Sequence, residues 1–500
     1  MLEEATVADL QHGLAAGRFT AASLVRQYLK RIEEVDRNGP RLKAVIELNP
    51  DAQATAEALD KERHDKGSRG PLHGVPVLIK DNIDTHDRMT TTAGSLALAG
   101  SIAPRDAFIV ERLRAAGAVV LGKTNLSEWA NFRGSRSISG WSGRGGLTRN
   151  PYATDRSPSG SSSGSAAGVS AGLCAVAIGT ETDGSIVSPA SYCGVVGLKP
   201  TIGLISRSGI IPIAASQDTA GPITRTVADA AALLGILTGV DSRDAATEAS
   251  SAKAKSDYTQ FLDVTALRGA RIGVARNFFG WHPRVDRVMD AALDTMRQAG
   301  AELVDPASLP SRQGLGDAEH QVMVYEFRAG LNAYFASLGT VAPVKSLKEL
   351  IELNERNRDR ELPFFGQETL TEAEAKGPLT EPAYLDARTR CLKWAREDGI
   401  DAVMDKHQLD ALIAPTTGPA HTLDLIAGDR GLGGSSSYAA VAGYPAITVP
   451  AGNIFGLPMG ISFFGRAWSE PRLLAISYSF EQATRARRTP QFLYTAEIEA

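Results

Sequence analysis

A stretch rich in Gly, Ser, Arg and Pro runs from residue 134 to residue 164 and most limits what this chain can fold into. Such a composition does not favour regular helix or strand, yet a connector of this length is uncommon inside a compact domain. Its last part, Ser157 to Ser165, leads into a small-residue helical pattern and an apolar strand, Cys174 to Gly179. Gly/Ser clusters are usually flexible linkers, but this apolar neighbour predicts a segment fixed at the edge of the core.

Short apolar strands alternate with helical patterns along the rest of the chain. Residues 7–65 carry apolar residues at helical spacing, and residues 271–305 show the pattern strand, helix, strand. This alternation predicts an α/β fold in which helices cover both faces of a sheet. The other strands are expected at 74–80, 118–122, 174–179, 411–414, 446–449 and 460–464, and the other helices at 108–116, 164–173 and 340–409.

Charge and hydropathy exclude several classes of protein. The chain has 53 Lys and Arg against 57 Asp and Glu, a net charge of −4, and no dense basic stripe, so a nucleic-acid partner is not expected. No apolar run approaches the roughly 18 residues that a membrane span needs. The acidic N-terminus lacks the pattern of a secretory signal. We expect a cytoplasmic protein, although an exported form with a removed leader is also compatible with the sequence.

The cysteines give no sign of a metal site or a disulfide framework. Cys174, Cys193 and Cys391 are odd in number, lie in apolar or helical surroundings and form no CxxC motif. We interpret them as buried, reduced thiols, and we expect neither a metal nor a cofactor.

Three features could carry chemistry: the serine block 157–165, the turn Thr182-Asp183-Gly184-Ser185 after an apolar strand, and Lys80 at the end of another apolar strand. A serine hydroxyl is a poor nucleophile until a base accepts its proton. A lysine can act as that base only when neutral, and burial favours the neutral form. Taken singly, each feature is also compatible with a flexible loop or a solvated strand end.

Together these features resemble the amidase signature family of serine hydrolases, and within it most closely the peptide amidases. The resemblance covers about residues 20 to 485. It is carried by residues 74–82, 122–128, 150–151, 157–165, 182–185, 194–201, 218–222, 414–416, 443–446 and 456–460.

The resemblance implies a catalytic triad and a fold. The family's nucleophile falls on Ser185, its second serine, which follows a cis peptide bond, on Ser161, and its general base on Lys80. The implied fold has a central, mostly mixed twisted β-sheet. The resemblance further implies one domain over residues 1–500, with N-terminal helices at 7–65, a catalytic core at 70–235, a variable and mostly helical substrate-side region at 260–410, and return strands at 411–485.

Other site residues follow from the same resemblance. Backbone groups of Thr182, Asp183 and Gly184 are expected to stabilise the oxyanion, although the family usually has glycine where this chain has Asp183. Substrate contacts are expected from Gly134, Ser135 and Ser162. Two further roles stay open. Asp218 can bond backbone near the site or cap a turn, and the aromatic residues of region 311–370 can line a substrate pocket or, as we favour, pack in the core.

The implied activity is hydrolysis of a linear carboxamide, in particular the C-terminal amide of peptides, to acid plus ammonia through an acyl-enzyme. The expected partner is a small-molecule or peptide amide, and the expected state is monomer or homodimer. An aryl acylamidase with the same triad is the nearest alternative. The glutamine-hydrolysing component of a tRNA-dependent amidotransferase is a weaker one, because such chains usually carry Arg where this chain has Val187. A catalytically silent binding protein is the third class, and it is disfavoured because each implied catalytic position holds the required residue type.

Two further motifs compete for the nucleophile. Gly160 to Gly164 satisfies GxSxG with Ser162 as nucleophile, but the nucleophile elbow needs a buried strand before it, and residues 150–159 are polar. Ser250 to Lys253 forms an isolated SxxK in a polar stretch, which we interpret as a coincidence.

Overall fold

A single large sheet forms the centre of the molecule. The computed structural model describes residues 2–310 and 314–497, and its main sheet has 11 strands in the order β1-β3-β2-β6-β8-β7-β12-β13-β11-β9-β10. The strands are β1 (Val45–Leu48), β2 (Pro76–Lys80), β3 (Val119–Thr124), β6 (Val176–Glu181), β7 (Val196–Lys199), β8 (Thr219–Thr224), β9 (Arg271–Val274), β10 (Glu302–Val304), β11 (Ala411–Pro415), β12 (Ala446–Ile454) and β13 (Leu457–Phe464). A small separate sheet pairs β4 (Trp141–Ser142) with β5 (Gly146–Leu147).

The main sheet is mixed, as the resemblance implies. Strand β2 is parallel to both of its neighbours, β3 and β6, whereas β8 is antiparallel to β6 and β7. Every residue of β2 and β6 is buried. Successive side chains point to opposite faces of a strand, so both faces of the sheet are covered at this point. This burial explains why these strands are continuous apolar runs rather than alternating ones.

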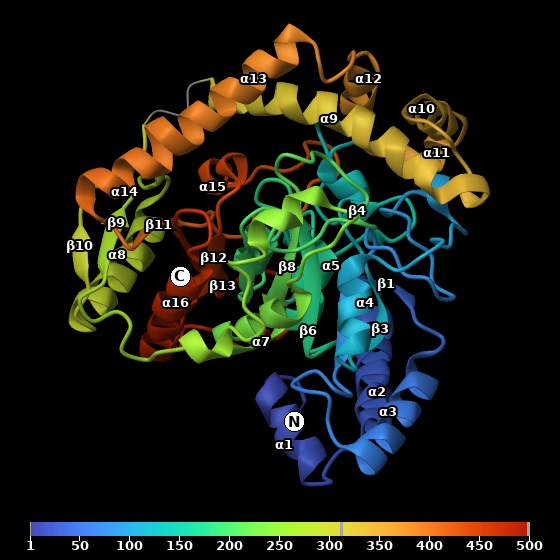
Figure 1. Cartoon of the computed structure of the whole chain (residues 1–500), viewed down its shortest axis with the longest axis horizontal. Helices are drawn as coiled ribbons and strands as arrows, with labels where there is room; N and C mark the ends of the chain where they lie inside the picture. The colour runs from blue at the N-terminus through green and yellow to red at the C-terminus, as the bar shows by residue number, and fades with distance from the viewer. Residues whose placement is uncertain (1, 311–313, 498–500) are drawn as a thin grey trace.

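Helices surround the sheet (Figure 1). Helix α5 contacts β2, β6 and β8, helix α7 contacts β7 and β8, and helix α16 contacts β12. The α-helices are α1 (Val7–Ala15), α2 (Ala21–Arg31), α3 (Ala52–Lys66), α4 (Phe108–Ala115), α5 (Ser163–Ser170), α6 (Val187–Tyr192), α7 (Val227–Leu237), α8 (Pro283–Gln298), α9 (Leu315–Leu338), α10 (Leu347–Arg356), α11 (Arg358–Glu361), α12 (Glu368–Glu374), α13 (Pro382–Leu392), α14 (Ala402–His407), α15 (Ser437–Ala442) and α16 (Glu470–Thr484). Short 3₁₀ or π segments lie at 32–38, 96–98, 128–131, 245–250, 259–261, 276–278, 339–341 and 393–401.

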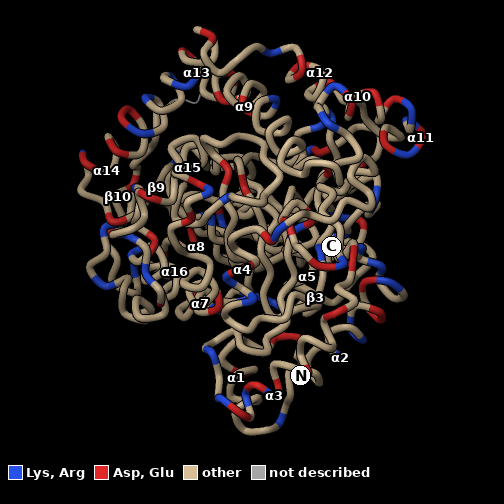
Figure 2. The backbone as a smooth tube through the Cα atoms, turned by 45° about the vertical axis from the view of Figure 1, so that its right-hand side comes forward, with Lys and Arg blue, Asp and Glu red and all other residues tan. Residues whose placement is uncertain are grey.

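An outer layer of helices lies against one side of this core. Figure 1 shows α9 and α13 side by side in an arc that continues into α14, and the two helices are in contact. Basic and acidic residues are interspersed along these outer helices (Figure 2). The buried side chains of Phe327 and Tyr334 belong to a hydrophobic cluster beneath the arc, which confirms core packing for these two aromatic residues. Residues 311–313, at the start of the 311–370 region, lie outside the described residues.

The N-terminal region differs from its prediction. Residues 7–65 are not helical throughout, because β1 lies between a π-helical turn and α3. This strand pairs with the edge of the sheet at β3 and is only half-buried. Its sequence is too short to stand out between two helical patterns. All three cysteines are buried, as predicted, and none of them forms a disulfide in this structure.

No helix in the described ranges is long and apolar enough to cross a membrane.

Candidate active site

Lys80 lies at the carboxyl end of β2, the third strand from the β1 edge of the main sheet, and its side chain is fully buried. Its Nζ is 2.8 Å from Ser161 Oγ, 2.8 Å from Thr180 Oγ1 and 3.2 Å from the Thr180 carbonyl oxygen. The parallel register of β2 and β6 brings the ends of these two strands together. The lysine therefore meets the serine block and the strand that precedes Ser185 at one point.

The contacts of Lys80 suit a neutral amine. Such an amine has two N–H groups to donate and one lone pair to accept a proton. Thr180 offers two acceptors, its carbonyl and its hydroxyl, and these can take both N–H groups. In this neutral form the lone pair can face the Ser161 hydroxyl, whereas the ammonium form donates to Ser161 Oγ. Asn82 Nδ2 also donates to Thr180 Oγ1, at 3.0 Å, and fixes the threonine side chain.

Burial favours the neutral form of this lysine. Desolvation lowers the pKa of Lys80 to about 7, against the opposing effect of the nearby carboxylates Glu181 and Asp218. Among the described residues Lys80 forms no ion pair. The adjacent Asp81 points to the other face of the strand, where it bonds Gly94 N at 3.3 Å and lies 3.5 Å from Arg144. The base form of Lys80 is therefore well populated near neutral pH.

Two other lysines are also fully buried at strand ends, but neither meets the serine block. Lys123 Nζ donates to Ile83 O and Thr91 Oγ1, and Lys199 Nζ donates to Tyr444 O at 2.7 Å and Pro200 O at 3.2 Å. Burial lowers the pKa of Lys199 to about 8. A buried strand-end lysine is thus not unusual in this fold, and the serine contact is what distinguishes Lys80.

The serine block and the 182–185 turn are joined through their backbones. Ser162 N donates to Ser185 O at 3.1 Å, and Ser162 Oγ bonds both the carbonyl and the N–H of Thr180. The Gly160–Ser161 peptide bond is cis, as the resemblance implies. The hydroxyls of Ser161 and Ser185 lie on adjacent segments but form no hydrogen bond with each other in this structure. Ser185 keeps 8% of its surface exposed, whereas Lys80 and Ser161 are fully buried, so Ser185 is the one of these three side chains that a substrate can reach.

The turn before Ser185 presents unpaired backbone donors. In the described part of the chain, no acceptor takes the N–H groups of Asp183, Gly184 or Ser185. Gly184 has a φ of 78°, which favours glycine, and a Cβ there would lie 3.0 Å from Ser188 Oγ and Ser436 Oγ. Backbone N–H groups fixed in this way can stabilise an oxyanion that forms on the substrate of Ser185.

Asp183 is fixed by a segment far away in the sequence. The hydroxyls of Ser436 and Ser437, at the start of α15, donate to its two carboxylate oxygens. The side chain is therefore directed toward α15, and the backbone of the turn keeps the conformation that its neighbour Gly184 allows. The aspartate that replaces the usual glycine is compatible with the predicted oxyanion turn.

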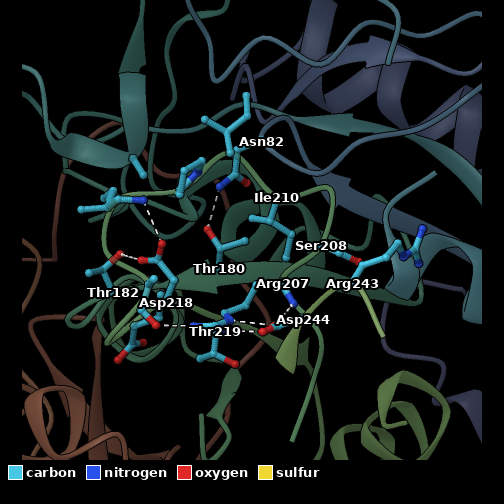
Figure 3. Close-up of a pocket in the computed structure, with 16 residues that line it drawn as sticks. Asn82, Thr180, Thr182, Arg207, Ser208, Ile210, Asp218, Thr219, Arg243 and Asp244 are labelled. Carbon is cyan, nitrogen blue, oxygen red and sulfur yellow. Dashed lines mark hydrogen bonds and ion pairs between the residues drawn. The ribbon is translucent and has the colours of Figure 1, made fainter. Parts of the chain in front are cut away.

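A cavity of about 220 Å³ opens beside Thr180, whose hydroxyl accepts a hydrogen bond from Lys80 (Figure 3). Asn82, Thr180 and Thr182 line it, and Asp218 lies next to Thr182. The cavity is large enough for several water molecules or a small substituent of a substrate.

Comparisons with known proteins identify the family. The family model described as Amidase matches residues 23–474. The chain belongs to the amidase family. It is 54% identical to a solved structure of the native peptide amidase from Stenotrophomonas maltophilia, with a TM-score of 0.93 over 98% of this chain and 99% of that one.

Two curated relatives extend the comparison. A probable amidase from Arabidopsis thaliana is 42% identical, over 98% of this chain and 92% of that protein. A putative amidase from Schizosaccharomyces pombe is 36% identical, over 98% of this chain and 87% of that protein. The family confirms that this chain is an amidase, a hydrolase of amides, and the likeness to peptide amidases confirms the predicted resemblance.

The predicted substrate residues Gly134 and Ser135 form no hydrogen bond with Lys80, Ser161 or Ser185. Gly134 N donates to Ser137 Oγ at 3.4 Å, and Ser135 N donates to Glu368 Oε2 at 3.2 Å. Ser135 therefore contacts the outer helical layer at α12. The structure brings neither residue into hydrogen-bonding contact with the three residues of the triad.

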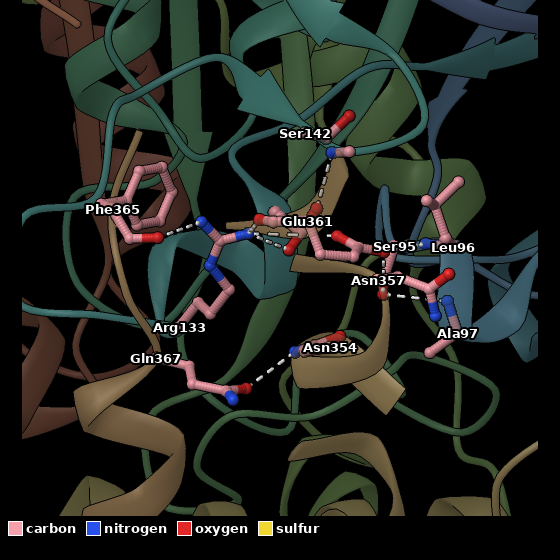
Figure 4. A network of polar contacts seen from close by, with 12 residues as sticks. Ser95, Leu96, Ala97, Arg133, Ser142, Asn354, Asn357, Glu361, Phe365 and Gln367 are labelled. Carbon is pink, nitrogen blue, oxygen red and sulfur yellow. Dashed lines mark hydrogen bonds and ion pairs between the residues drawn. The ribbon is translucent and has the colours of Figure 1, made fainter. Parts of the chain in front are cut away.

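A buried polar network anchors this segment of the amidase (Figure 4). The guanidinium of Arg133 bonds Glu128 at 2.6 Å and lies 3.8 Å from the centre of the Phe365 ring. Burial and the neighbouring Glu361 raise the pKa of Glu128 well above its usual range. Arg133 therefore ties the loop before Gly134 to α11 and the residues that follow it.

The competing motifs find little support in this amidase. The segment before Gly160 contains no β-strand, and the Ser162 hydroxyl is buried and engaged with Thr180. Ser162 is therefore placed as a structural link rather than at the surface of the cavity. Ser250 of the SxxK motif donates to Thr247 O within a 3₁₀ turn. Within residues 2–310 and 314–497, no three His, Cys, Asp or Glu side chains gather in a metal-binding arrangement.

The roles of four contributors to the site were missed from the sequence. Thr180 and Asn82 lie inside or beside the motifs that carry the resemblance, but their role depends on the register of β2 and β6. Ser436 and its neighbour belong to a second Gly/Ser cluster, 433–437, whose composition resembles that of the serine block. That likeness is the signal that could have indicated α15 as part of the site.

Proposed function

We propose that this amidase hydrolyses the C-terminal carboxamide of peptides to free acid and ammonia through an acyl-enzyme on Ser185. The contact of 2.8 Å between Lys80 Nζ and Ser161 Oγ carries this proposal, because it joins a buried base to the serine block. The 54% identity to a peptide amidase supports the choice of substrate.

In the first half of the proposed reaction, neutral Lys80 accepts a proton from Ser161, which takes one from Ser185. Ser185 Oγ attacks the carbonyl carbon of the amide and a C–O bond forms. The N–H groups of the 183–185 turn stabilise the oxyanion; in other hydrolases such a donor contributes roughly 2.7 to 4 kcal/mol. The proton then returns through Ser161 to the amide nitrogen, the C–N bond breaks, and ammonia leaves.

In the second half, water attacks the ester on Ser185 and its proton follows the same route. The carbonyl–Oγ bond breaks, the carboxylic acid leaves, and Ser185 recovers its proton. Both halves need Lys80 as an amine at the start. Since burial lowers the pKa of this lysine to about 7, the reactive form predominates above that pH and is lost as the pH falls through it.

A panel of amides tests the proposed substrate. We expect ammonia release from peptides with a C-terminal amide at a higher kcat/KM than from free glutamine or short aliphatic amides, and a lower rate of aniline release from anilides. Free glutamine is disfavoured because this chain has the buried, apolar Val187 at the sequence position where the amidotransferase chains usually carry an arginine, which could pair with a carboxylate. Efficient cleavage of anilides with inert peptide amides would instead identify an aryl acylamidase, and a preference for glutamine would identify a glutaminase.

A further inference from the structure

Asp218 lies opposite the turn that carries Ser185. Strand β8 pairs antiparallel with β6, with Thr219 opposite Glu181 and Ala220 opposite Thr180. Asp218 precedes Thr219, so the register places it across from Thr182, the first residue of the turn. Its side chain is directed at Thr182 and the adjacent cavity (Figure 3).

The carboxylate of Asp218 connects two segments of the site. One oxygen accepts from Thr182 Oγ1 at 2.6 Å, and the other accepts from the backbone N–H groups of Ile213 at 2.8 Å and Ala214 at 2.9 Å. Asp218 thus ties the start of the oxyanion turn to the 213–214 segment of the cavity wall. A buried carboxylate with three donors is a rigid connection, because loss of any donor leaves a polar group unpaired.

Charged groups surround Asp218 on several elements. Burial raises its pKa to about 6, and the nearby Arg207 guanidinium opposes this effect. Arg207 is paired with Asp244, and both line the same cavity together with Arg243. From β6 and β2, Glu181 and Lys80 face the same region, and the carboxylates of Asp218 and Glu181 both favour the charged form of Lys80.

We propose that Asp218 is a positioning residue of the amidase reaction, which fixes the oxyanion turn through Thr182. This inference rests on the proposed function of Ser185. Asp218 touches neither Lys80 nor either serine in a hydrogen bond, so it acts through the turn and through its charge rather than on the reacting atoms.

Three variants test this role. In Asp218→Asn the amide oxygen can still accept from Ile213 N and Ala214 N. The amide nitrogen that replaces the second oxygen cannot accept the hydrogen bond from Thr182 Oγ1. We expect kcat to fall about 100-fold with little change in KM, as for other small misplacements of a catalytic group. Because the charge that favours protonated Lys80 is removed, the pH at which kcat/KM begins to fall also moves to lower values. Thr182→Val keeps the charge of Asp218 but removes the hydrogen bond between residues 182 and 218. We therefore expect kcat to fall while the pH at which kcat/KM begins to fall stays unchanged.

Asp229→Asn is the matched control. Asp229 is another buried carboxylate that accepts a backbone N–H, from Val7 at 2.9 Å, but it lies on α7 away from the site. Thermal unfolding is measured for all variants, and we expect Asp229→Asn to keep the wild-type kcat even if it unfolds earlier. A wild-type kcat and pH profile in Asp218→Asn would overturn the proposal. A loss of activity in Asp218→Asn that is no larger than its loss of folded protein, as expected for the control, would also overturn the proposal.

The assay separates this inference from the proposed substrate. The variants are compared on whichever amide of the panel the wild type cleaves, and also by the rate at which a fluorophosphonate labels Ser185. If peptide amides are inert but labelling of Ser185 slows in Asp218→Asn, the proposed substrate is wrong and the role of Asp218 holds. If peptide amides are cleaved equally by Asp218→Asn and the wild type, the substrate holds and the role of Asp218 is wrong.

Discussion

Replacement of Ser185 by alanine will lower the kcat for amide hydrolysis by about 10⁶-fold, the size of effect seen when other serine hydrolases lose their nucleophile. The physical reason is that Ser185 is the nucleophile of the proposed mechanism and ends the 183–185 turn, whose backbone N–H groups are unpaired among the described residues. Ser161 is fully buried, whereas Ser185 is not. The measurement is ammonia release from a peptide amide, with circular dichroism and thermal unfolding to establish that the variant is folded.

Ser162→Ala is the control for this prediction. Its hydroxyl bonds only the backbone of Thr180, so we expect a less stable enzyme that retains measurable turnover. Turnover by Ser185→Ala above the uncatalysed rate, with an inactive but folded Ser162→Ala, would assign the nucleophile to Ser162 and contradict the proposed mechanism.

Replacement of Lys80 by methionine will lower kcat by about 10⁴-fold, near the upper end of what a general base contributes. Methionine fills a similar space and removes the amine that accepts the proton. The side chain of Lys80 is the one buried amine among the described residues that lies within hydrogen-bonding distance of Ser161. Single-turnover acylation, followed by mass spectrometry, is the measurement because it isolates the step that needs the base.

The matched control is Lys199→Met. Lys199 is equally buried at the end of a strand and its amine bonds only backbone carbonyls, so its loss tests the effect of removing a buried lysine as such. We expect a change in stability with the acylation rate kept within a few-fold. Equal loss of acylation in both variants would mean that Lys80 acts through the fold rather than as a base.

The strands that position the site could be predicted because burial on both faces makes them continuous apolar runs. Strand β2 is an example, since Pro76 to Ile79 have no polar side chain and Lys80 ends the run. Strand β1 could not be predicted, because an edge strand of four half-buried residues has no such signal. The position of β8 beside β6, which places Asp218, is a property of the sheet order and not of any local pattern.

The residue types of the candidate triad follow from sequence, but their environment does not. That Lys80 is buried could be inferred from its strand, and its lowered pKa agrees with that inference. That Thr180 offers two acceptors to the amine depends on the register between two parallel strands. The contact between Asp183 and α15 joins residues more than 250 positions apart. Contacts between residues so far apart in the chain produce no local sequence pattern, so a single sequence does not reveal them.

The pH dependence of Ser185 phosphonylation by a fluorophosphonate tests the central claim, that a neutral Lys80 removes the proton of Ser185 through Ser161. A fluorophosphonate is allowed to label the wild-type enzyme between about pH 5 and pH 9, and the labelled residue is identified by peptide mass spectrometry. We predict one adduct, on Ser185, with a rate constant that rises about tenfold per pH unit below a pKa of about 7 and is constant above it. A rate that does not change across this range, or an adduct on another serine, would contradict the claim.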